Sequence, residues 1–179
     1  MRNTGLTLTT EGGRYVISDL TIDNISQDII QFTNYMRNSA SKQPRNQYRG
    51  QIVLSRQPIR LLDGKYVTQY ILTNILPLPK YMAGIAETYD GEALEKVKTM
   101  YLISKHYALY YMGKKNSHLF ITSGSNFDLT DDPRINQKYV GAGYEGLSKK
   151  WLQATRELSG ITLLYNSTIP ILPYFACSP

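Results

Sequence analysis

The residues best suited to do chemistry are cations that gather in one part of the chain. Between positions 37 and 62 the sequence has six basic residues and no Asp or Glu. Outside this stretch the charges cancel, because the whole chain has 20 Lys and Arg against 14 Asp and Glu. The basic residues are Arg37, Lys42, Arg45, Arg49, Arg56 and Arg60. This local excess indicates a polyanionic partner, nucleic acid first, because guanidinium groups pair with phosphate and stack on bases.

Amide and aromatic side chains alternate with these cations along the basic segment, residues 37–66, and into the strand expected after it. Asn and Gln can read base edges, and a Tyr ring can stack on an unpaired base. We therefore expect contacts with nucleic acid, with RNA favoured. The expected nucleic-acid-binding residues are Lys42, Arg45, Tyr48, Arg49, Arg56, Arg60, Lys65, Tyr66, Thr68 and Tyr70. The alternative is a solvated loop followed by an edge hairpin that arginine keeps soluble.

No catalytic, metal-binding or nucleotide-binding motif accompanies the cations. The two histidines, His106 and His118, have no metal-ligand spacing to Cys or carboxylates. No GxxxxGK[ST] phosphate loop is present. The Asp residues between 128 and 132 lack the spacing of a calcium loop, which favours a solvated acidic turn. We expect a non-enzymatic protein without catalytic residues, cofactor or metal; an enzyme whose site uses inconspicuous positions is the open alternative.

Two hairpins are predicted in the first half of the chain. Alternating residues at 6–10 and 14–18 flank a Gly-Gly turn. The β-rich runs 51–56 and 66–75 flank Asp63-Gly64, which favours a tight turn. If the second pair forms, the side chains at positions 66, 68 and 70 share one sheet face near Arg56 or Arg60. Pro58 predicts that the first of these strands is short, bulged or exposed.

Three helices are predicted, over residues 24–38, 91–112 and 144–158. The central helix should begin at an Asp90 N-cap and end at Gly113. Its second half is apolar on nearly all sides, so other elements or another subunit must cover it. The expected subunit-interface residues are Tyr101, Tyr107, Tyr110, Tyr111 and, from the last helix, Trp151. The alternative is a core helix whose Tyr hydroxyls reach the surface.

The predicted fold class is α+β, an antiparallel sheet of four to six strands with about three α-helices. Residues 1–179 are expected to form a single domain with an extended C-terminal tail over 161–179. No signal peptide and no bilayer-spanning apolar run is predicted, which favours a soluble protein made in a cytosol. The lone thiol, Cys177, excludes an intrachain disulfide.

Several fragments of the first eighty residues occur in the order of a known family. They are LTLTTEGGRYVIS, the basic segment, Ser55-Arg56-Gln57, and GKYVTQYILTNI closed by proline. In this plan the chain resembles the coat proteins of small single-stranded RNA phages. The resemblance implies a sheet that faces RNA inside a shell, helices over 91–112 and 144–158 that interlock subunits, and genome-facing residues among Arg49, Arg56, Arg60, Lys65, Tyr66, Thr68 and Tyr70.

These observations favour one function and leave another open. We expect a viral or phage structural protein, a self-assembling coat or particle subunit of the virion made in the host cytoplasm. It would contact nucleic acid through the basic segment and associate with itself as a dimer or larger assembly, without a membrane partner. The alternative is a monomeric nucleic-acid-binding or regulatory module.

Overall fold

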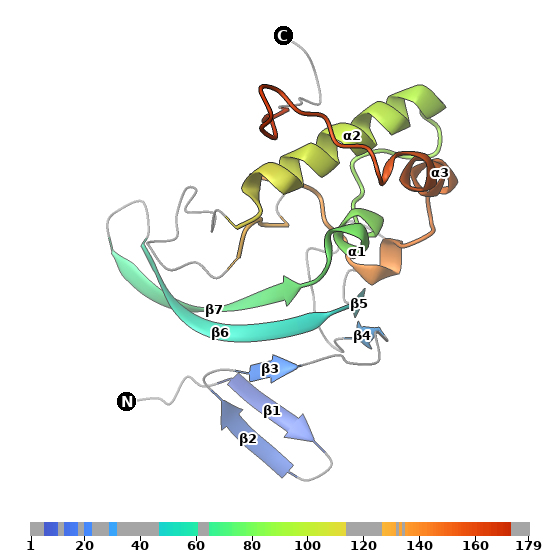
Figure 1. Cartoon of the computed structure of the whole chain (residues 1–179). Helices are drawn as coiled ribbons and strands as arrows, with labels where there is room; N and C mark the ends of the chain where they lie inside the picture. The colour runs from blue at the N-terminus through green and yellow to red at the C-terminus, as the bar shows by residue number, and fades with distance from the viewer. Residues whose placement is uncertain are drawn as a thin grey trace.

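Strands dominate the first half of the chain and helices the second. The computed structural model describes residues 6–10, 13–17, 20–22, 29–31, 47–60, 65–113, 127–131, 133 and 135–172. The strands are β1 (Leu6–Thr10), β2 (Gly13–Ile17), β3 (Leu20–Ile22), β4 (Ile30–Gln31), β5 (Gln47–Tyr48), β6 (Gln51–Arg60) and β7 (Tyr66–Ile75). The helices are α1 (Leu78–Ala83), α2 (Leu94–Tyr111), the short 3-10 helix η1 (Ala142–Tyr144) and α3 (Lys149–Leu158). Figure 1 shows the three α-helices on one side of the β6–β7 pair and the β1–β2 hairpin on the other.

The expected sheet of four to six strands is wrong. The described strands divide into separate antiparallel pairings, and the largest sheet is the long β6–β7 pair with the three-residue β3 beside β6. The molecule is therefore a small α+β arrangement. Alternating sequence runs identify strands but not their partners, because the pairings of β3 and β4 join segments far apart in the chain. Both predicted hairpins, β1–β2 and β6–β7, are confirmed.

One local expectation fails, and one strand is longer than expected. The helix predicted over 24–38 is wrong at Ile30–Gln31, which pairs as β4 with β5; the rest of that range, apart from Ile29, lies outside the described residues. A β-branched residue at position 30 suits this pairing, and the tertiary contact overrides the helical spacing. Strand β6 also continues through Pro58, beyond the last position that β3 pairs with, where a strand tolerates a residue without an N–H.

Asp90 caps a different helix from the one predicted. Helix α2 begins after Ala93 without a side-chain cap. The Asp90 carboxylate instead accepts hydrogen bonds at the start of α3, from Ser148 Oγ at 2.6 Å and from the N–H groups of Lys149 and Lys150 at 3.1 and 3.2 Å. Ser148 Oγ in turn accepts from Trp151 N at 3.1 Å. The hydrogen bond from Ser148, followed by those from α3, holds the pKa of Asp90 below its usual 3.8.

The core forms where the helices meet the start of β6 and the end of β7. Trp151 of α3 donates its indole N–H to Met82 O at the end of α1, at 2.8 Å. Its ring lies edge-on to that of Tyr101 in α2, with centroids 5.3 Å apart. Ile52 of β6 joins the same buried cluster. Burying side chains of this size contributes about 2 kcal/mol each, so this junction holds the helices and the sheet together.

The cap of α3 gives a first prediction. Ser148→Ala should lower the free energy of unfolding by about 1 kcal/mol, because the first turn loses an acceptor. Asp90→Asn should also destabilise the protein at pH 7. Because folding lowers the pKa of Asp90, its contribution is complete above pH 3.8 and is lost as the pH falls below that value. The difference between wild type and Asp90→Asn should therefore narrow toward pH 3.

Urea unfolding followed by circular dichroism at several pH values measures this difference. Glu95→Gln is the matched control, since its carboxylate is 81% exposed and pairs only at the surface. A gap between wild type and Asp90→Asn that stays constant from pH 7 to pH 3 would contradict the charge-dependent role of Asp90.

Candidate nucleic-acid interface

The β6–β7 pair brings most of the predicted nucleic-acid-binding residues that can be described to one end of a ribbon. Arg56 lies opposite Tyr70, Pro58 opposite Thr68, and Arg60 opposite Tyr66. Alternate positions of a strand share a face, so Tyr66, Thr68 and Tyr70 lie on the face that also carries Arg56. The strand pairing expected from the sequence is therefore confirmed, and its register interleaves aromatic and cationic positions.

The two ends of this face have different surroundings. Near the helices, Ile52 is buried and Leu72 packs against the core. Toward the loop, Arg56, Lys65 and Thr68 are exposed, Tyr66 is 63% exposed, and Tyr70 is half-buried. Figure 1 shows the loop end of the ribbon extending past the helices. One sheet face is thus core at one end and accessible at the other, and we call residues 56–60 with 65–70 the ribbon tip.

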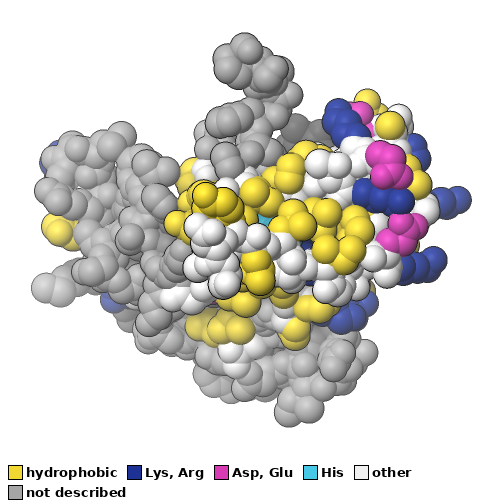
Figure 2. Space-filling view, turned by 45° about the horizontal axis from the view of Figure 1, so that its top comes forward, with side chains coloured by type: hydrophobic (Ala, Val, Ile, Leu, Met, Phe, Trp, Pro, Cys, Tyr) yellow, Lys and Arg dark blue, Asp and Glu magenta, His cyan; other side chains and the backbone are white. Residues whose placement is uncertain are grey.

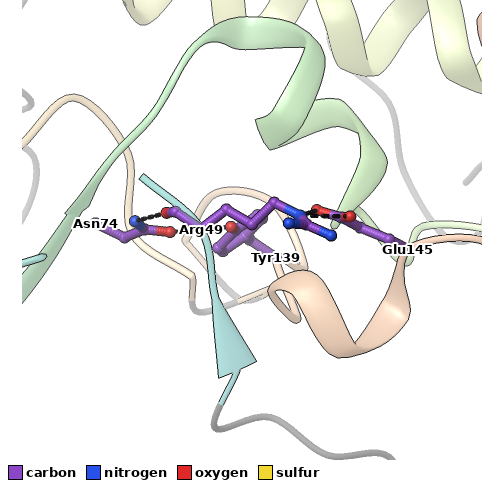
Figure 3. A network of polar contacts seen from close by, with 4 residues as sticks. All are labelled: Arg49, Asn74, Tyr139 and Glu145. Carbon is purple, nitrogen blue, oxygen red and sulfur yellow. Dashed lines mark hydrogen bonds and ion pairs between the residues drawn. The ribbon is translucent and has the colours of Figure 1, made fainter. Parts of the chain in front are cut away.

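A polar network fixes the other end of the ribbon to the helical half (Figure 3). Asn74 Nδ2 donates to Arg49 O at 2.7 Å and to Gln51 O at 3.2 Å. Its Oδ1 accepts from Tyr139 OH at 3.0 Å. Arg49 Nε donates to both carboxylate oxygens of Glu145, at 2.8 and 3.1 Å. Burial is the main reason that the pKa of the Tyr139 hydroxyl is raised, so it stays a neutral donor.

Two predicted nucleic-acid-binding residues belong to this anchored end. Tyr48 is 4% exposed, so its ring has no accessible face on which a base could stack. The Arg49 side chain is 25% exposed and forms an ion pair with Glu145. The structure thus assigns both side chains to the fold. Lys42 and Arg45 lie outside the described residues. For Arg60 only the main chain is described, through its pairing with Tyr66.

The predicted subunit-interface residues also divide into two groups. Tyr101 and Trp151 are 1% and 4% exposed and pack against each other, so they belong to the core of the single chain. Tyr107, Tyr110 and Tyr111 are half-buried and form a ring cluster toward the end of α2, with centroids 4.7 and 5.2 Å apart. Burial is the main cause of the raised pKa values of Tyr101 and Tyr111.

Two of the other titratable groups that the sequence singled out, Asp128 and His106, have structural partners. Asp128 accepts a hydrogen bond from Gly113 N at 3.0 Å, just after α2. His106 is buried in α2, and His118 lies outside the described residues. Within the described ranges, no group of three or more His, Cys, Asp or Glu side chains is arranged to hold a metal ion. No helix in the described part of the chain has the length and apolar character needed to cross a membrane.

Sequence reasoning missed Asn74, Tyr139 and Glu145, which anchor the ribbon. Their contacts with one another and with Arg49 and Gln51 span 23 to 96 positions in sequence, so no local spacing joins them. One signal was available, since an Asn late in a β-rich run needs partners for its amide once the strand is buried. The glycines around 141 gave another, because a Cβ at Gly141 would lie 2.3 Å from Gln47 O.

Comparison with known proteins adds no family to this description, because no protein-family model, curated protein or solved structure matches the chain. The resemblance to RNA phage coat proteins therefore depends on the fragments in the first eighty residues alone.

The anchor network gives a second prediction. Asn74→Ala should lower the free energy of unfolding by about 1–3 kcal/mol, because the Tyr139 hydroxyl and the Arg49 carbonyl lose their partner. Thr68→Ala, an exposed change on the same strand, should stay within about 0.5 kcal/mol of wild type. Urea unfolding at pH 7 compares the two variants. Equal stabilities would show that the network does not hold the ribbon.

Proposed function

We propose that the chain is a self-associating subunit of a viral or phage nucleoprotein particle, made in the host cytoplasm, and that its ribbon tip binds single-stranded RNA. The observation that carries the RNA half is the register of β6 and β7, which sets Arg56 and Arg60 opposite Tyr70 and Tyr66 beyond the helical core. Exposed Arg56 and Lys65 for phosphates and exposed Tyr66 for a base then lie at one end of the ribbon.

The spacing of the rings favours unpaired bases. Tyr66 and Tyr70 are four residues apart in β7, which is about 13 Å along an extended strand. Each ring therefore offers a separate stacking platform. Bases stacked on one another in a duplex would not reach such platforms, whereas unstacked bases of a single strand would.

The self-association half of the proposal is supported by exposed apolar side chains. Leu164 is 61% exposed and Tyr165 70% exposed, and both belong to the segment that follows α3. In the view of Figure 2 charged side chains crowd one end of the visible face, while apolar and uncharged side chains fill its middle. Exposed apolar side chains of this size favour contacts with other chains.

One observation favours the alternative, a monomeric nucleic-acid-binding module. Tyr101 and Trp151 serve the core of a single chain, so two residues expected to bind a second copy are already occupied. The mass of the purified protein at micromolar concentration separates the two functions, because a module stays monomeric and a particle subunit does not.

A third prediction tests the RNA half. The double variant Arg56→Ala with Arg60→Ala should weaken binding of a labelled single-stranded RNA and reduce the slope of log K against log salt by about 1.4, because each lost phosphate contact removes about 0.7. Tyr66→Ala should weaken binding further, whereas Tyr66→Phe keeps the ring and should bind like wild type. Anisotropy titrations over a range of salt concentrations measure both effects.

The matched control removes two exposed cations of α3, Lys149→Ala with Arg156→Ala, and changes the net charge equally. Its affinity and salt slope should stay closer to wild type than those of the ribbon variant. Equal losses in the two double variants would show a general effect of net charge and would remove the ribbon tip from the interface.

A further inference from the structure

The segment after α3, residues 159–168, is attached to α2 along one edge of its main chain; we call it the C-terminal strap. Lys105 Nζ donates to Ser159 O and to Ile161 O, both at 2.6 Å. His106 Nε2 accepts from Leu163 N, also at 2.6 Å. Lys105 and His106 are 6% and 0% exposed, so these attachments lie beneath the strap.

The contacts of His106 define its tautomer. Its Nδ1 lies 2.7 Å from Leu102 O, which can only accept, so Nδ1 carries the hydrogen. Nε2 then has a lone pair for Leu163 N–H, and the ring is neutral. The amine of Lys105 supplies donors to the strap carbonyls, and burial lowers its pKa. Two side chains of α2 therefore satisfy the main-chain groups on the inner edge of the strap: His106 accepts one hydrogen bond and Lys105 donates two.

The strap ends in a tight turn that cannot grow into a longer hairpin. Tyr165 and Thr168 exchange main-chain hydrogen bonds of 2.9 and 3.0 Å around Asn166 and Ser167, whose φ angles are 47° and 60°. Positive φ at both central positions is typical of a type I′ turn. The next hydrogen-bonded pair would join Leu163 to position 170, but Pro170 has no N–H. His106 takes the Leu163 N–H instead.

The outer edge of the strap lacks such partners. In an extended chain the main-chain groups of successive residues point to opposite edges, so Thr162 and Leu164 face away from the edge that α2 occupies. Within the described residues, the main chain of neither residue makes a hydrogen bond. Thr162 is exposed, and Leu164 is 61% exposed. The strap therefore presents, at two exposed residues, main-chain groups without hydrogen-bond partners in the described part of the chain.

No charged residue protects this edge from pairing. Natural edges are guarded by charged residues, yet after Glu157 the chain has no Asp, Glu, Lys, Arg or His. Exposed Leu163 and Leu164 flank the edge with apolar side chains. A charged partner would find no complementary group here, whereas an identical neutral strap meets no opposing charge. The occupant that fits is a second copy of this chain.

We propose that two copies associate by antiparallel pairing of their C-terminal straps, with Leu163 on the two-fold axis and Thr162 of each copy opposite Leu164 of the other. This inference rests on the proposed self-association and specifies the segment through which two copies would bind each other. In such an isologous pairing each new main-chain hydrogen bond forms twice, once on either side of the two-fold axis, and the exposed leucines are covered. It leaves the ribbon tip outside the contact.

Charge placement at the edge tests the register. Thr162→Lys with Leu164→Lys should set like charges opposite one another twice and weaken self-association about tenfold in sedimentation velocity. Thr162→Lys with Leu164→Glu changes the same positions but sets opposite charges across the axis, so association should return toward wild type. Thr99→Lys with Gln153→Lys adds two charges on exposed positions of α2 and α3 and controls for net charge.

The outcomes separate this inference from the proposed function. A wild-type protein that stays monomeric, or an association constant that is the same in both strap variants, would overturn strap pairing. At protein concentrations too low for self-association, the affinity for a short RNA should be equal for the wild-type protein and the variant Thr162→Lys with Leu164→Glu. Loss of RNA binding in the ribbon variants alone supports RNA binding by the ribbon tip, whatever the result of the strap experiment. Absence of RNA binding in the wild-type protein overturns the RNA-binding proposal but leaves strap pairing untouched.

Discussion

The side-chain amide of Asn74 is the constraint on which the arrangement of this molecule depends. Its donors hold the main chain where it enters β6, and its acceptor receives the hydroxyl of Tyr139 from the segment before η1. Three parts of the chain that are distant in sequence thus meet at one group. A half-buried amide left without these partners would cost more than an apolar residue in its place, so the site specifies a single way of joining the ribbon to the helices.

The ion pairs of the helical half lie on the other side of this junction from the ribbon tip. In the helical half, Lys96 pairs with Glu92, and Lys98 lies between Glu95 and Glu157. Glu145 takes the guanidinium of Arg49 at the base of the ribbon. At the ribbon tip, the exposed cations Arg56 and Lys65 occur together with the exposed Tyr66. Because exposed ion pairs contribute little to stability, the helical charges serve mainly to keep that surface polar.

Local patterns in the sequence were sufficient for the elements that depend on neighbours in the chain. The alternation in β7 and the Asp63-Gly64 dipeptide identified the second hairpin, and the apolar run with Gly113 at its end identified α2. Pairings that depend on distant segments were not accessible in this way. Ile30 has helical spacing to its neighbours yet forms a strand with Tyr48, and Asp90 has the form of an α2 cap yet binds the start of α3. Of the candidate site, the strand face with Tyr66 and Tyr70 and with Arg56 opposite was predictable. The burial of Tyr48 and the ion pair of Arg49 were not, because they depend on Tyr139 and Glu145, which are distant in sequence.

The position of Trp151 has a practical consequence. It is the chain's one tryptophan, and it lies where α1, α2 and α3 meet, with Tyr101 against its ring. The wavelength of indole emission responds to hydration, so this residue is a built-in optical reporter of the helical junction alone. A change in emission would register loosening of that junction, while rearrangement confined to the loop end of β6 and β7 would leave the signal unaltered.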